Sequence, residues 1–132
     1  MEPAAPARTS EAAATPFKNR PFRTRLGFAL VGVLAVWRRE RSFRTQSLIG
    51  GAALVATLLL RPGWIWAAAI LLSTGLVLAL ELANAALEYA LDRLHPSFAE
   101  EIGLAKDAAA GAVLLASIVA ACVGAAMLLS LA

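Results

Sequence analysis

Three long apolar runs, separated by short polar breaks, dominate the pattern of this chain. They cover residues 45–60, about 64–92 and about 103–131, and the breaks are residues 61–63 and the turn at Pro96. A helix needs about 20 residues to cross a bilayer core of about 30 Å. The second and third runs reach that length alone, and the first reaches it with the residues before it. The pattern predicts three transmembrane helices.

Residues 22–42 show a different pattern. Apolar positions recur there every three to four residues, and arginines flank them at both ends. The apolar middle, about twelve residues, is short for a membrane span. A helix with one apolar and one basic face lies in the membrane interface, where arginines meet anionic headgroups. We expect an N-terminal interfacial amphipathic helix here, and a true short span is the alternative.

Composition and charge agree with a membrane protein. Of the 132 residues, 60% are hydrophobic, which is too many for an ordinary soluble domain. Nine of the twelve lysines and arginines precede residue 46, and no charge follows Asp107. Basic segments stay on the cytoplasmic side, so the N-terminal segment and the loop at 93–106 are predicted to be cytoplasmic. Little chain is left for a soluble scaffold, so we expect no nucleic-acid partner.

The rest of the sequence indicates the domain organisation. Residues 1–20 lack a packable pattern and are predicted to be a disordered N-terminal tail, whereas residues 21–132 form one membrane domain. The single cysteine, Cys122, lies in an apolar run, so we expect a small buried side chain and no disulfide or metal-thiolate site. Three membrane helices enclose a polar site poorly, and an oligomer is therefore expected.

A polar stripe interrupts the end of the second apolar run. Its members, spaced i, i+3, i+7 and i+11, are Glu81, Asn84, Glu88 and Asp92. This spacing places them on one helix face about 16 Å long. An intramembrane carboxylate costs roughly 2.5–3.5 kcal/mol, so the stripe requires cations, a bound metal or protons as partners.

Other charged residues are predicted at the same cytoplasmic boundary, namely Glu40, Lys106 and Asp107. Carboxylate oxygens suit Mg²⁺, a lysine suits phosphate, and a further carboxylate can accept a proton from an attacking hydroxyl. Phosphoryl transfer uses these parts, and an acceptor at membrane depth would be a lipid alcohol. A non-enzymatic ion pathway or a membrane assembly protein would also use such a stripe. The spacing alone leaves a lipid kinase and an ion pathway equally open.

Three blocks of the chain resemble signatures of the small bacterial integral-membrane diacylglycerol kinases, a family that also contains undecaprenol kinases. ELANAALEYALDRL resembles the signature E-L-x-N-x-A-x-E-x-x-x-D, AKDAAAGAVLL resembles the second signature, and RRERSFRTQ resembles the block E-x-x-F-R. The blocks occur in the family's order and with its spacing, over about residues 22–126.

The resemblance implies an all-α homotrimeric bundle. Each subunit would have the interfacial helix and three transmembrane helices, with active sites between subunits at the cytoplasmic face of the bacterial inner membrane. ATP with Mg²⁺ would phosphorylate a lipid hydroxyl, with diacylglycerol as the first expected acceptor and undecaprenol as the alternative. Gln46 replaces a glutamate of the enterobacterial enzymes, and AAAGAV looks closer to the undecaprenol kinases. Pro21 falls at the place of an early family arginine, with Arg23 and Arg25 nearby.

The resemblance also implies roles for individual residues. Glu81 looks like the catalytic base. Glu40 and Glu88 look like the carboxylates that hold the Mg²⁺ of ATP. The implied nucleotide contacts are Phe28, Glu40, Glu88, Asp92, Lys106 and Asp107, with Asn84 in support. The implied lipid contacts are Phe43, Arg44 and Glu81.

Overall fold

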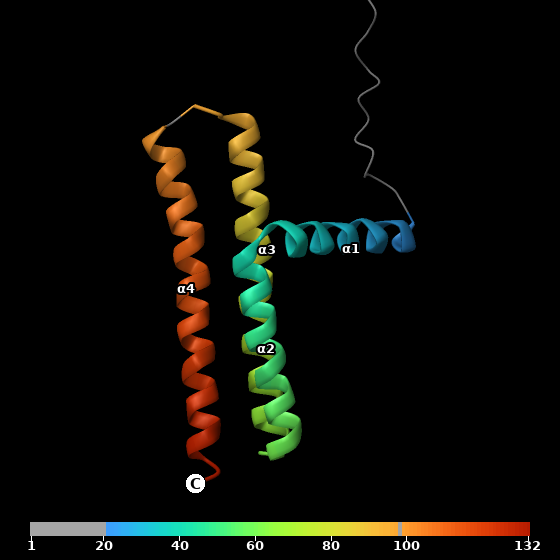
Figure 1. Ribbon diagram of the computed structural model, residues 1–132, viewed down its shortest axis with the longest axis vertical. Helices are drawn as coiled ribbons and strands as arrows, with labels where there is room; N and C mark the ends of the chain where they lie inside the picture. The colour runs from blue at the N-terminus through green and yellow to red at the C-terminus, as the bar shows by residue number, and fades with distance from the viewer. Residues whose placement is uncertain (1–20, 98) are drawn as a thin grey trace, which may run out of the picture. The chain divides into compact units, whose positions relative to one another are not determined.

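The computed structural model describes residues 21–97 and 99–132. The predicted disordered tail at 1–20 lies outside the described residues. The predicted all-α fold is confirmed, and the helices are α1 (Phe22–Arg39), α2 (Arg41–Leu60), α3 (Trp64–Leu94) and α4 (Glu100–Leu129) (Figure 1). By length and composition α2, α3 and α4 are each able to cross a membrane.

The chain divides after Gly32 into two compact units, so α1 begins in one unit and ends in the other. Along α1 only Val36 is buried. Its last turn carries Arg38 and Arg39, whose charges suit the carbonyl end of a helix dipole. The interfacial position of α1 stays a prediction.

Backbone conformation sets the ends of the helices. Glu40 is extended, with φ −97° and ψ 117°, and separates α1 from α2. Arg61 ends α2 in the left-handed region, at φ 50° and ψ 51°, where its N–H donates to the Thr57 carbonyl at 3.0 Å. Gly63, at φ 102°, then precedes α3 in a conformation that side chains rarely allow. These breaks produce the tight turn expected from the residues 61–63.

The helices run past the uncharged residues on which the predicted spans rested. α2 begins at Arg41 rather than at residue 45, α3 continues to Leu94, and α4 begins at Glu100. Glutamate, lysine and arginine are good helix formers, and long basic side chains reach out of a bilayer. Helix ends therefore follow backbone breaks and not the limits of apolar composition.

α3 is the central span, because it packs against both α2 and α4 (Figure 1). Successive spans run antiparallel, so the end of α3 and the start of α4 lie together at one end of the bundle, whereas α2 begins about halfway along α3. A small apolar cluster near the start of α2 consists of Val36, Phe43, Ala85, Leu78 and Leu82. Trp37 meets Phe43 edge-on, with ring centroids 6.3 Å apart. This cluster fixes the beginning of α2 against α3.

Polar side chains add links between α2 and α4. Gln46 Nε2 donates to Ser117 Oγ at 3.1 Å, and Thr57 Oγ1 lies 3.7 Å from Met127 Sδ. A cavity of about 210 Å³ lies between the three spans, and Gln46 and Ser117 are among the few polar residues in its lining. Hydrogen bonds of this kind contribute about 0.6 kcal/mol each between membrane helices, so these two links hold α2 to α4 only modestly.

Most of the bundle surface is apolar and uncovered in a single chain. Leu58 and Leu72, for example, are each 75% exposed, as expected of side chains that lipid tails would cover. The prediction that Cys122 is buried is wrong, because its side chain is exposed. The reason is that α4 buries only a narrow stripe, which consists of Val113, Ala116 and Met127.

We expect Gly50→Ala to destabilise the bundle by about 1–3 kcal/mol, the usual cost of overpacking. A Cβ atom at Gly50 would overlap the Thr74 methyl group where α2 meets α3. The measurement is the midpoint of unfolding in mixed micelles as denaturing detergent is added. Thr74→Ser removes that methyl group and should restore most of the stability lost in Gly50→Ala.

Gly51→Ala is the matched control, because a Cβ atom at Gly51 would meet nothing within 4 Å in the chain. Its unfolding midpoint should stay close to that of the unmodified protein. A double variant, Gly50→Ala with Thr74→Ser, that is no more stable than Gly50→Ala would rule out the close approach as the cause.

Candidate active site

Glu81 is the only charged side chain that is buried among the described residues, at 5% exposure. It lies in α3 at the level of the first turn of α2, where Ser42 Oγ donates a hydrogen bond to Glu81 Oε2 at 2.9 Å. An ionised carboxylate only accepts hydrogen bonds, so the serine is the donor. One carboxylate oxygen is held by this bond, and Oε1 lies outside it.

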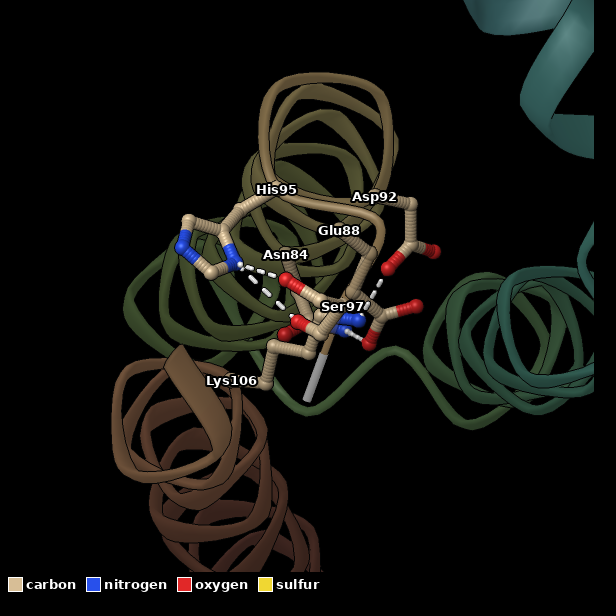
Figure 2. Close-up of polar contacts among 6 residues, drawn as sticks. All are labelled: Asn84, Glu88, Asp92, His95, Ser97 and Lys106. Atoms are coloured by element: carbon tan, nitrogen blue, oxygen red, sulfur yellow. Dashed lines mark hydrogen bonds and ion pairs between the residues drawn. The ribbon is translucent and has the colours of Figure 1, made fainter. Parts of the chain in front are cut away.

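Asn84 and Glu88 lie one turn apart on the same face of α3. Asn84 Nδ2 donates to Glu88 Oε1 at 2.8 Å (Figure 2). The other amide atom, Asn84 Oδ1, is buried and has no hydrogen-bond partner within the described chain. An unpaired buried acceptor costs about 1–3 kcal/mol, so this oxygen suits a donor from a bound molecule or a neighbouring subunit.

Tyr89 connects the end of α3 to the junction between α1 and α2. Its hydroxyl donates to Glu40 Oε1 at 2.5 Å. The guanidinium carbon of Arg39 lies 6.0 Å from the centroid of the tyrosine ring, within the range of a cation–π contact. Glu40 is therefore held against α3 by Tyr89, which lies 49 residues further along the sequence.

Lys106 in α4 forms an ion pair with Asp92 at the end of α3 (Figure 2). The side chains are 31% and 65% exposed respectively, so the pair contributes only about 0.2–1 kcal/mol to stability. The following residue, Asp107, is exposed and borders a shallow depression with Glu100 and Glu101. In the loop between α3 and α4, His95 Nδ1 lies 3.0 Å from the Ser97 carbonyl oxygen (Figure 2).

The carboxylates of Glu40, Glu81 and Glu88 are each held by a neutral donor. The pairs are Ser42 with Glu81, Asn84 with Glu88, and Tyr89 with Glu40. Across residues 21–97 and 99–132 no basic side chain forms an ion pair with any of these three carboxylates. Neutral donors orient a carboxylate without cancelling its charge, so the cluster keeps its attraction for a cation.

The described residues contain no group of three or more side chains ready to ligate a metal. Mg²⁺ commonly takes only one or two carboxylates and completes its coordination with water and phosphate oxygens. Glu40 and Glu88, each oriented by a hydrogen bond, have the chemistry for that arrangement.

Three further residues have roles that the resemblance implies. Phe43 is 4% exposed and belongs to the apolar cluster. Arg44 Nη1 donates to the carbonyls of Trp37 and Arg38, at 3.3 and 3.1 Å, and so caps the end of α1. Phe28 lies in the other unit, before residue 33. Contacts of these three with lipid or nucleotide stay predictions.

No sequence motif pointed to Ser42 or Tyr89. Both partner a carboxylate that lies on another helix or at a helix junction, and spacing within one helix does not reveal such pairs. Ser42 does lie between Glu40 and Phe43 in the block RRERSFRTQ, and that position was the available signal.

Comparison with known proteins shows the family of this chain. The family model of prokaryotic diacylglycerol kinase matches residues 27–128. A diacylglycerol kinase of Synechocystis is 42% identical over 103 residues, which cover 77% of this chain and 59% of the relative. A diacylglycerol kinase of Escherichia coli K12 is 34% identical over 94 residues, which cover 71% of this chain and 77% of the relative. The chain thus belongs to the prokaryotic diacylglycerol kinase family.

Proposed function

We propose that this protein is an ATP-dependent lipid kinase that transfers the γ-phosphoryl group of Mg-ATP to the hydroxyl of a membrane lipid. The observation that carries the proposal is the buried Glu81 carboxylate, which lies on the same face of α3 as Glu88 and is oriented by Ser42 of α2. The two relatives, which are both diacylglycerol kinases, support the same reaction.

Glu81 acts as the general base. It lies seven residues deeper along α3 than Glu88, or about 10 Å at 1.5 Å per residue. The lipid hydroxyl arrives at the deeper level from the membrane, and the nucleotide arrives at the outer level from water. As the hydroxyl oxygen bonds to the γ-phosphorus, the bond from phosphorus to the β–γ bridging oxygen breaks and ADP leaves. Glu81 accepts the hydroxyl proton.

The outer residues bind the nucleotide. Glu40 and Glu88 hold the Mg²⁺, which when bound offsets the negative charge of the phosphate oxygens. Lys106, partly exposed in its pair with Asp92, is able to turn toward a phosphate as a point charge. Asn84 orients Glu88, while Asp107 is a further nucleotide contact. A contact between Phe28 and the nucleotide stays a prediction.

The working enzyme is a homotrimer in the bacterial inner membrane, with its active sites at the cytoplasmic face. Two observations support an assembly: the uncovered apolar surface of α2, α3 and α4, and the buried Asn84 Oδ1 that lacks a partner within the described chain. A neighbouring subunit would cover the apolar surface and would donate a hydrogen bond to Asn84 Oδ1.

Diacylglycerol is the proposed acceptor, and phosphatidic acid is then the product. The names of the relatives favour it. Undecaprenol is the alternative acceptor, because Gln46 departs from the glutamate of the enterobacterial diacylglycerol kinases.

The test is transfer of labelled phosphate from ATP by the purified full chain in mixed micelles containing Mg²⁺. Diacylglycerol and undecaprenol are supplied in parallel, and Glu81→Gln is the control. We expect a labelled lipid product with diacylglycerol that the variant forms at least about 100-fold more slowly. A labelled product with undecaprenol alone would show that undecaprenol, and not diacylglycerol, is the acceptor. Folded protein that labels neither lipid would overturn the kinase assignment, and cation flux through liposomes would then be measured.

A further inference from the structure

We infer that Ser42 is a positioning residue for Glu81. Its hydroxyl holds Glu81 Oε2 and so leaves Oε1 as the oxygen that accepts the proton of the lipid hydroxyl. The inference rests on the proposed function, because it concerns how the base of that reaction is aimed.

The geometry of the bond supports this role. Ser42 Oγ and Glu81 Oε2 are 2.9 Å apart, and the two residues come from different helices, α2 and α3. A buried glutamate with several rotatable bonds has no fixed direction unless a partner holds it. Because Glu81 is 5% exposed, solvent water has little access to it, and Ser42 is the partner that the described residues provide.

Ser42 is itself fixed on both sides. Two residues before it, Glu40 accepts the hydrogen bond of Tyr89 in α3. The next residue, Phe43, is 4% exposed and packs in the cluster that contains Ala85 of α3. The backbone at Ser42 is therefore fixed against α3, the helix that carries Glu81. The Ser42 hydroxyl in turn fixes the direction of the Glu81 carboxylate.

Ser42 has a second chemical possibility. A hydroxyl within about 2.6–3.2 Å of a base also has the arrangement of an activated nucleophile. If Ser42 accepted phosphate from ATP, it would be an acceptor and not a positioning residue. The experiment must separate these roles.

We expect Ser42→Ala to lower kcat about 10- to 100-fold, the effect of losing one hydrogen bond to a charged group. The KM values for Mg-ATP and for lipid should stay within about twofold, because bound substrates keep their own contacts. Ser42→Thr keeps the hydroxyl and should recover most of the rate. Ser47→Ala, a serine on the same helix outside the site, is the matched control and should leave both constants unchanged.

A double-variant cycle gives a readout that a general structural role would not move. In the Glu81→Gln background, Ser42→Ala should change the residual rate by less than about twofold. The reason is that substitutions of two contacting residues that act together have effects that do not add. Mass spectrometry after incubation with Mg-ATP, without lipid, should find no phosphate on Ser42.

Several results would overturn the inference while leaving the kinase assignment intact. They are full activity in Ser42→Ala, an equal loss in both backgrounds, a raised KM with an unchanged kcat, and phosphate bound to Ser42. Absence of lipid phosphorylation by the unmodified protein would instead refute the proposed function itself. The two failures are therefore distinguishable.

Discussion

Glu81→Gln is expected to lower kcat for lipid phosphorylation by about 10²- to 10⁴-fold, the usual contribution of a positioned general base. Glutamine keeps the size of the side chain, and its amide oxygen still accepts the bond from Ser42, but it does not take up the proton. No other carboxylate in the described part of the chain is buried. The measurement is the initial rate at saturating Mg-ATP and lipid.

Glu101→Gln is the matched control for this variant. Glu101 lies in the first turn of α4 and is exposed, so the same chemical change there should leave kcat unchanged. The unfolding midpoints of both variants should match that of the unmodified protein. If the Glu81→Gln enzyme had a normal kcat, Glu81 would not be the general base.

Glu88→Gln is expected to reduce kcat/KM for Mg-ATP by roughly 100-fold or more. A bound metal contributes several kcal/mol to charge stabilisation in such reactions, and each 1.4 kcal/mol is a factor of ten. Glutamine is a weaker ligand for Mg²⁺ than glutamate. Its amide oxygen is also uncharged, so the hydrogen bond that it accepts from Asn84 Nδ2 is weaker than the bond to the Glu88 carboxylate. Activity measured against Mg²⁺ concentration at fixed ATP should show a higher half-maximal concentration.

Chelation gives the complementary measurement. Removing Mg²⁺ with a chelator should stop transfer by the unmodified enzyme, and adding Mg²⁺ back should restore it. The Glu101→Gln control should have the Mg²⁺ dependence of the unmodified enzyme. If the Mg²⁺ curve of Glu88→Gln coincided with theirs, Glu88 would not be a ligand.

The sequence predicts the features that depend on one helix at a time. Three apolar runs indicate three spans because only the length and composition of each segment matter. The face shared by Glu81, Asn84 and Glu88 follows from 3.6 residues per turn, whatever packs beside it. The bond between Asn84 and Glu88, which are four residues apart, is of the same local kind.

The features that the sequence does not predict depend on how helices meet. The pairing of Ser42 with Glu81 requires the register of α2 against α3, and neither helix alone contains that register. Tyr89 reaches Glu40 only because the chain leaves the helical conformation at residue 40. The packing of Phe43 against Ala85 in the apolar cluster likewise depends on how α2 meets α3.

The start of α2 is held against α3 by one small apolar cluster, and this has a consequence for how the enzyme would be inactivated. Within a membrane the backbone hydrogen bonds of a span stay inside that span, so α2 would move away from α3 without unwinding if the cluster around Phe43 came apart. Such a movement separates Ser42 from Glu81 while the helix content is unchanged. Circular dichroism of an ageing preparation would then remain constant as its activity fell. For this protein an intact helical spectrum is a poor guide to an intact catalyst.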